Sequence, residues 1–158
     1  MKIISPGTFS GCSSLKYVGI TSKITSIEHG AFSNCKSLIK ISIPASVKII
    51  GKLAFSNCHS MEELHFEPGS SLSYIGIRSF VYCISIQKIF IPSTVRKIDE
   101  YAFYSCLNAK KLGFEDPSYL PIINNYAFSY CKSLTSTNIP HSVKSIASNA
   151  FLGCPLKF

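Results

Sequence analysis

The sequence predicts an α/β solenoid, and three observations support this: a motif recurring at a regular interval, two apolar spacings inside each repeat, and length variation confined to one loop. The motif F-x-x-C occurs seven times, with its aromatic residue at Phe9, Phe32, Phe55, Phe80, Phe103, Phe128 and Phe151. The intervals between these residues are 23, 23, 25, 23, 25 and 23. A unit of this length cannot bury its own apolar face and must stack on its neighbours.

We number the complete units 1 to 6 by the phenylalanine that closes them, from Phe32 to Phe151. Unit 4 is the most regular and shows the expected elements in order. In its segment IFIP, residues 89–92, the isoleucines are two apart, which is the strand period, so both point inward and Phe90 points out. Pro92 lacks an N–H and ends this first strand. The segment VRKI that follows predicts a second, short extended segment on the opposite side of the unit.

The end of each unit, read as A-F-x-x-C in unit 4, predicts a corner made of a single turn of α- or 3₁₀-helix. Phenylalanine and cysteine three residues apart lie on one face of such a turn. Residues that suit a turn or a helix cap come before it: Gly51, Gly76, Asp99 and Asn124. Stacking then aligns the seven phenylalanines, and burying each is worth roughly 1.5–3 kcal/mol. We expect this column to make the largest single contribution to stability.

All variation in length falls in the connection after the first strand. The connection from residue 66 to 72 in unit 3, and that from 114 to 120 in unit 5, are each two residues longer than the others. Insertions confined to one place are typical of a loop that faces solvent at one edge of a stack.

The composition supports a packed core, since 46% of the 158 residues are hydrophobic and 15% are charged. We therefore expect one elongated domain over residues 1–158, with about six repeats of 23 or 25 residues and partial repeats at its ends. Both ends expose repeat edges, which favours a piece of a longer array or end-to-end self-association. No apolar run approaches the ~18 residues of a membrane span, and the first residues lack the apolar core of a signal peptide.

The seven cysteines occupy one column of the repeat, which argues against a disulfide framework. Equivalent side chains in a stack project in parallel, so we expect a buried column of free thiols used as small apolar residues. There is no Cys-x-x-Cys pair and no histidine at ligand spacing, so no metal site or other cofactor is expected.

Catalysis has no support in the sequence. The four histidines, His29, His59, His65 and His141, fall at different positions of the repeat. No serine lies in a G-x-S-x-G motif. We expect a protein that is not an enzyme and has no small-molecule substrate.

The recurring pattern L-x-x-I-x-I-P-x-x-V-x-x-I-x-x-x-A-F-x-x-C resembles the leucine-rich repeats of the BspA-like, or Treponema pallidum, type over essentially the whole chain. The resemblance implies a right-handed solenoid with a parallel sheet on its concave side. It also implies proteins that work by binding, often at a cell surface. The sequence alone leaves a cytoplasmic and a surface-associated location open.

Function is then expected on the outward-facing positions of the first strands, with Phe90 beside His65 and flanked by lysines as the best anchor. The candidate residues on this face are Tyr17, Lys40, Ser42, Glu63, His65, Lys88, Phe90, Lys111 and Asn138. Two hypotheses follow. In the first, the face binds a protein partner. In the second, the net charge of +8 attracts a polyanion, such as an acidic glycan, nucleic acid or an anionic membrane.

Overall fold

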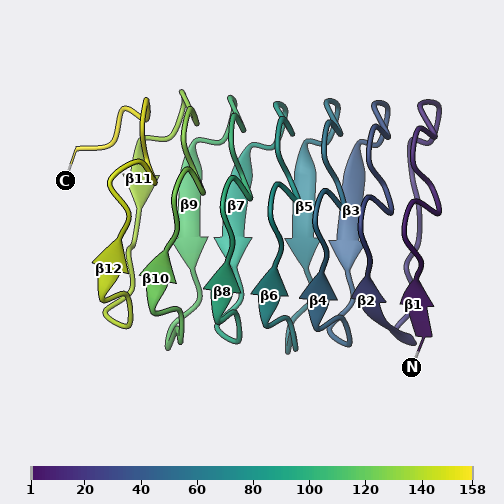
Figure 1. Cartoon of the computed structure of the whole chain (residues 1–158), viewed down its shortest axis with the longest axis horizontal. Helices are drawn as coiled ribbons and strands as arrows, with labels where there is room; N and C mark the ends of the chain where they lie inside the picture. Colours follow the sequence, from purple (N-terminus) through teal and green to yellow (C-terminus); the bar gives the residue numbers. More distant parts are fainter. Residues whose placement is uncertain (1, 158) are drawn as a thin grey trace.

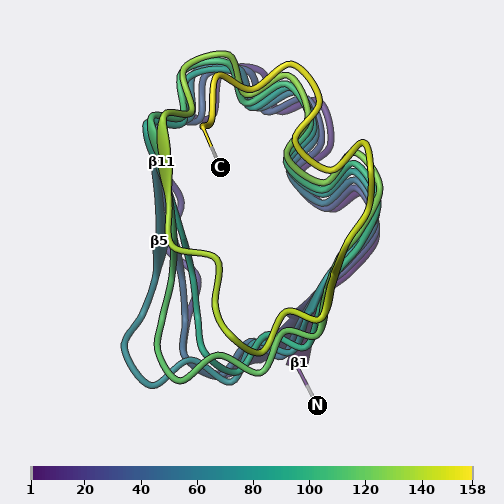
Figure 2. The ribbon, with the colours of Figure 1, turned by 90° about the vertical axis from the view of Figure 1, so that its left-hand side faces the viewer.

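The computed structural model describes residues 2–157 as one stack of similar turns, placed side by side along a nearly straight axis (Figure 1). The first strands of the units are β3 (Lys40–Ile43), β5 (Glu63–Phe66), β7 (Lys88–Ile91), β9 (Lys111–Phe114) and β11 (Ser136–Thr137). The second row is β1 (Lys2–Ile4), β2 (Ile24–Ile27), β4 (Ile49–Ile50), β6 (Tyr74–Ile75), β8 (Lys97–Ile98), β10 (Ile122–Ile123) and β12 (Ser145–Ile146). Viewed along the stack, the two rows form opposite walls of the cross-section (Figure 2).

The phenylalanine column is the centre of the core, as the sequence predicts. The five middle members have no exposed surface: Phe32, Phe55, Phe80, Phe103 and Phe128. Neighbouring rings stack with centroids 4.9–5.5 Å apart along the whole column. The inward residues of both strand rows and the cysteine column surround it. The repeat pattern therefore identified the core correctly.

The cysteines are free thiols, and five of the seven are buried. Each buried thiol also donates a hydrogen bond to the phenylalanine carbonyl of the preceding turn, for example Cys83 Sγ to Phe55 O at 3.1 Å. Burial is the main reason that the pKa of Cys35 is raised to about 12 and that the pKa of Cys106 is raised. Each buried thiol thus packs as an apolar side chain and also donates a hydrogen bond to a main-chain carbonyl.

The two strand rows differ in continuity, and here the sequence-based expectation needs correction. The short second segments form one parallel sheet of seven strands, in the order β1-β2-β4-β6-β8-β10-β12. The first strands, expected to form the main concave sheet, form two short sheets, β3-β5 and β11-β9-β7. The row is therefore interrupted between β5 and β7, although both strands are present.

The interruption has a chemical cause at the residue that follows each first strand. In units 3 and 5 this residue is glutamate. The Glu67 N–H donates to Ile43 O at 3.0 Å, and the Glu115 N–H donates to Ile91 O at 2.9 Å. In units 2, 4 and 6 the residue is a proline, which has no N–H to donate: Pro44, Pro92 and Pro140. Four-residue pairings with the preceding unit are accordingly found for units 3 and 5.

The corners consist of tight turns, and no residue from 2 to 157 is helical, so the expected helical corner is not confirmed. In most corners the residues two before and two after the column phenylalanine have left-handed φ, as Leu53 and Asn57 do at 58°. A helix needs consecutive right-handed residues and cannot cross these positions. Corner amides bond along the stack instead, and the Phe55 N–H donates to Ser79 O of the next corner at 2.7 Å.

The variable connections lie at the edge of the stack away from the corners. Figure 2 shows the loops of units 3 and 5 reaching beyond the others at the foot of the first-strand wall. This agrees with the expectation that length varies only where a loop faces solvent.

Candidate functional site

We call the outward surface of β3, β5, β7, β9 and β11 the first-strand face. Eight of the nine predicted residues have exposed side chains, and Ser42 is half-buried. Strand pairing places Lys40 beside Glu63 and Ser42 beside His65 on β3 and β5. It places Lys88 beside Lys111 on β7 and β9. Tyr17 lies in the first turn, outside any strand, with 66% of its surface exposed.

Phe90 is the most exposed apolar side chain on the strands of this face, at 55%. Its ring lies over Gly113 on the neighbouring strand: a Cβ atom at position 113 would come within 2.7 Å of Phe90 Cδ2. Glycine at that position therefore makes room for the ring to lie against β9. The ring is supported on one side and open to solvent on the other.

Charge on the first-strand face is divided by the gap between β5 and β7. On one side, Lys40 Nζ and Glu63 Oε2 form an ion pair at 2.9 Å. On the other side, Lys88 and Lys111 are register neighbours on paired strands, which lie about 4.8 Å apart. Neither lysine is in an ion pair within the described part of the chain. Phe90 therefore sits beside two cations with no acidic partner.

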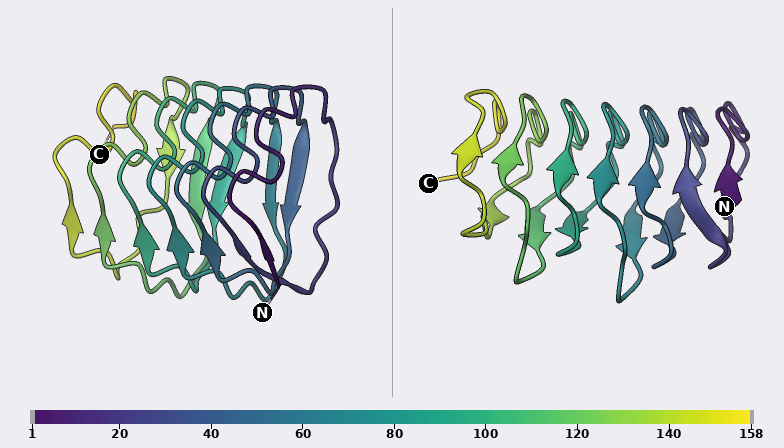
Figure 3. Two further views of the ribbon diagram at one scale, coloured as in Figure 1. Left: turned by 45° about the vertical axis from the view of Figure 1, so that its right-hand side comes forward. Right: turned by 60° about the horizontal axis from the view of Figure 1, so that its bottom comes forward.

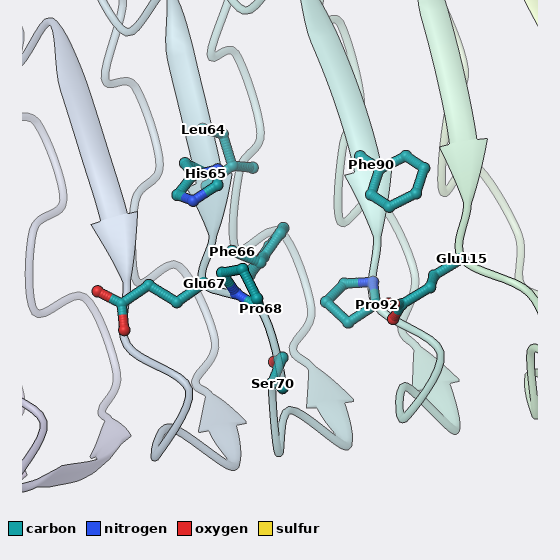
Figure 4. Close-up of a pocket in the computed structure, with 10 residues that line it drawn as sticks. Leu64, His65, Phe66, Glu67, Pro68, Ser70, Phe90, Pro92 and Glu115 are labelled. Atoms are coloured by element: carbon teal, nitrogen blue, oxygen red, sulfur yellow. The ribbon is translucent and has the colours of Figure 1, made fainter.

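A groove of about 270 Å³ occupies the region where β5 and β7 fail to pair. His65 and Phe66 line it from β5, and Phe90 and Pro92 line it from β7 and the residue after it. Figure 4 shows His65 and Phe90 on the two sides of this opening. The predicted pair is thus on one face, but the two side chains flank a gap and do not form one continuous patch.

Asn138 is exposed, but its side-chain amide is committed to the neighbouring strand. Its Oδ1 accepts the Phe114 N–H at 2.9 Å, and its Nδ2 donates to Phe114 O at 3.1 Å. The Asn138 amide thereby bonds the main chain of Phe114 in place of a paired strand, because the last turn leaves the sheet after β11. Asn138 therefore has a structural role on the first-strand face, and its part in binding stays a prediction.

A second, partly exposed aromatic cluster was not predicted from the sequence. Five tyrosines from the corners of units 3 to 5 form a series of ring contacts: Tyr82, Tyr101, Tyr104, Tyr126 and Tyr130. Burial, and then the neighbouring tyrosines, raise the pKa of Tyr104. For four of the five, the signal in the sequence is tyrosine two residues before or after the column phenylalanine, where the first turns mostly have glycine or asparagine. Tyr104 directly follows Phe103.

Among residues 2–157 there is no cluster of three or more histidine, cysteine, aspartate or glutamate side chains that could hold a metal ion. Over the same residues, no helix has the length and apolar character needed to cross a membrane.

Short parallel strands, a stacked aromatic core and turns of 23 or 25 residues define a solenoid of the leucine-rich repeat class. The model of the BspA type leucine rich repeat region matches the chain in six copies, over residues 1–110 and 65–158. The chain belongs to this family. A comparison with curated proteins finds no match.

Solved structures of bacterial leucine-rich repeat proteins share the fold. A protein from Eubacterium ventriosum is 29% identical, with a TM-score of 0.82 over 91% of this chain and 38% of its own. The Treponema pallidum leucine rich repeat protein is 27% identical, with a TM-score of 0.81 over 91% of this chain and 65% of its own. A leucine rich cell surface protein from Faecalibacterium prausnitzii is 31% identical, with a TM-score of 0.74 over 84% of this chain and 35% of its own. The chain thus spans less than two thirds of each.

Proposed function

We propose that this chain is a non-enzymatic, protein-binding part of a surface-exposed protein and that it binds through the first-strand face, with Phe90 as the anchor. The observation that carries the proposal is the Phe90 ring, which is 55% exposed and supported by Gly113. A large aromatic side chain on a rigid strand, surrounded by polar residues, has the character of a binding hot spot. The groove beside it would receive an apolar side chain of the partner.

The relatives support the surface location. One similar structure is of a leucine rich cell surface protein, and another is of the pneumococcal vaccine antigen PcpA, at 28% identity and a TM-score of 0.71. Both cover more than four fifths of this chain, so the likeness extends over most of the stack. We take a surface protein as the setting in which the first-strand face meets its partner.

A polyanion is the alternative ligand, and one observation favours it. Exposed basic residues occur on every second turn just before the second strands, at Lys48, Arg96 and Lys144. Main-chain bonds, together with the pairing of β8 and β10, place them in one column with Ser73 and Pro121 between them. Alternate turns are about 9.6 Å apart, twice the strand spacing, so these residues form a widely spaced row of positive charge on the other wall.

The deciding experiment measures capture of purified matrix and cell-surface proteins by the immobilised chain at low and high salt. We expect binding that persists at high salt and falls at least about 30-fold in Phe90→Ala, which corresponds to a hot spot of about 2 kcal/mol. Tyr119→Ala is the matched control, because Tyr119 is 53% exposed, close to the 55% of Phe90, and is not one of the candidate residues of the first-strand face.

Binding that disappears as salt rises and ignores Phe90→Ala would refute the protein-binding proposal. If such binding is also lost when Lys48, Arg96 and Lys144 are changed together to alanine, the polyanion alternative replaces it.

A further inference from the structure

The corners of units 3 to 5 place tyrosine at backbone positions that favour glycine. At the corners of the first turns, the left-handed residues are mostly glycine and asparagine: Gly7, Gly11, Gly30, Asn34, Leu53 and Asn57. In the later corners the same positions hold Tyr82, Tyr101, Tyr126 and Tyr130, with φ of 57–58°. Glycine and asparagine adopt this conformation most readily, whereas a bulky side chain strains it. The fold itself therefore does not call for tyrosine here.

Residues held in strained conformations are concentrated at functional sites. We define the tyrosine surface as Tyr82, Tyr101, Tyr104, Tyr126 and Tyr130. The rings of Tyr101 and Tyr126 stack with centroids 4.7 Å apart, and Tyr104 meets Tyr82 and Tyr130 edge-on at 5.8 and 5.4 Å. Ring packing offsets part of the strain, yet Tyr82 remains 46% exposed. Figure 3 shows that successive corners form one edge of the stack, away from the strand walls.

A groove of about 390 Å³ opens beside this surface. Five of its seven lining residues have φ between 55° and 58°: Leu53, Asn57, Arg78, Tyr82 and Tyr101. The strained backbone positions thus converge on one hollow. Its volume lies in the range of sites for small ligands, which are lined by aromatic residues and a few polar groups.

Arg78 is the one charged residue that lines the groove. Its guanidinium carbon lies 5.0 Å from the centroid of the Tyr101 ring. No ion pair involves Arg78 in the described part of the chain. A guanidinium held against an aromatic ring presents a planar fork of donors that matches a carboxylate. The charge of the groove therefore selects an acidic ligand.

We propose that this groove binds an acidic sugar unit of a glycan, with the sugar carboxylate paired to Arg78, which Tyr101 supports, and the sugar ring resting on the exposed ring of Tyr82. The C–H bonds on one face of a pyranose ring carry partial positive charge and pack against the negative face of an aromatic ring. Asn57, which also lines the groove, supplies amide groups for sugar hydroxyls. This site is separate from the first-strand face and does not depend on its function.

The substitutions for the test copy residues that other units carry at the same corner positions. Tyr82→Asn introduces the residue found at Asn34 and Asn57, and Tyr101→Gly introduces the residue found at Gly30. Both variants should keep or raise the urea midpoint of unfolding, since they relieve a strained backbone position. Both should weaken sugar binding at least tenfold.

Binding is measured by titrating the full chain with 3′-sialyllactose, with a glucuronic acid disaccharide and with neutral lactose, followed by NMR shifts of the tyrosine rings. The two acidic probes separate a sialic from a uronic acid ligand. We expect at least one to bind tenfold more tightly than lactose and to lose that preference in Arg78→Gln. Tyr119→Ala is the matched control: Arg96 lies 5.0 Å from the Tyr119 ring centroid in the same type of contact elsewhere.

The proposal is overturned if neither acidic sugar binds, if lactose binds equally well, or if Tyr119→Ala reduces binding as much as Tyr82→Asn. Capture of a protein that is lost in Tyr82→Asn, together with no binding of either acidic sugar, would make the surface a protein-binding site and also overturn it. Phe90→Ala should leave sugar binding unchanged. A negative result in this test therefore does not bear on the proposal for the first-strand face, and the reverse also holds.

Discussion

Replacing Phe103 with alanine tests whether the phenylalanine column holds the stack together. Phe103 is fully buried, and its ring stacks at 4.9 Å on Phe80 and at 5.4 Å on Phe128, with interplanar angles of 2° and 5°. The substitution removes a buried ring and leaves a cavity between two rigid neighbours, so we expect a loss of about 3–5 kcal/mol in the free energy of unfolding. Urea denaturation followed by circular dichroism measures it.

Phe9 provides the matched control, because it is the first ring of the column and is only half-buried. Phe9→Ala should cost less than half as much as Phe103→Ala. Repeat arrays can unfold in more than one step, so amide hydrogen exchange should accompany the melt and show the lost protection centred on units 3 to 5. A loss below about 1 kcal/mol for Phe103→Ala, or equal losses for the two variants, would refute the reasoning.

Four further predictions follow from the same contacts. In the native protein the exposed Cys12 should react with a thiol reagent at once, whereas the five buried cysteines should react only on unfolding; rapid native labelling of more than the two end cysteines would contradict their burial. Burial raises the pKa of Asp99, but hydrogen bonds from Lys97, from the Glu100 amide and from Tyr74 outweigh it and leave the pKa below its usual value. The stabilisation from Asp99 should therefore be complete above its unfolded-state pKa of about 3.9 and be lost as the pH falls through the folded-state value, so the stability difference between wild type and Asp99→Asn should shrink in acid; a constant difference would argue against it. Pro92→Ala restores a main-chain donor between β5 and β7 and should slow amide exchange along both strands, with Pro155→Ala as the control; unchanged exchange would mean that proline is not the cause of the gap. End-to-end association predicts an apparent mass that rises with concentration in light scattering, and a constant monomer mass would exclude it.

The sequence predicted the repeat, the buried columns and the variable loop because each depends on one side chain recurring at one position. Its error over the two strand rows has a different origin. Pro92 was correctly seen to end its own strand, but its larger effect is on the pairing with β5, one unit earlier. That effect can be predicted only when the strand that the missing N–H would bond is known.

The corners show a similar limit. Phenylalanine and cysteine three residues apart fit a helical turn, but the same spacing also fits the non-helical tight turn that the structure has. The left-handed residues on either side, such as Gly30 and Asn34 at φ of 60°, are what rule the helix out. Glycine and asparagine in these two columns of the early units were the available signal. Tyrosine in the same columns of later units hides it, because tyrosine is not typical of left-handed turns.

The candidate face was predicted in outline but not in its connections. Strand alternation placed Phe90 outward and the lysines beside it, as the structure has them. The gap that separates His65 from Phe90, and the use of the Asn138 amide as a substitute for main chain, depend on hydrogen bonds between units. The sequence shows which residues can make such hydrogen bonds but not which residues of the neighbouring unit they bond.

The alternation of proline and glutamate after the first strand explains where the candidate site lies. Each glutamate makes two bonds to the unit before it: its N–H continues the strand ladder, and its carboxylate accepts a turn amide, as Glu115 Oε2 does from the Ser93 N–H at 2.8 Å. Each proline makes neither bond. Units 2 and 3 are thereby joined into one pair and units 4 and 5 into another, each pair spanning 23 plus 25 residues. The sheet opens between β5 and β7, and the groove beside Phe90 occupies that opening. After unit 5 the sheet stays closed, because β11 pairs with β9 over two residues even though Pro140 follows it. The residue after each first strand therefore sets how far the strand pairs with the preceding unit: four residues where it is glutamate, and two or none where it is proline.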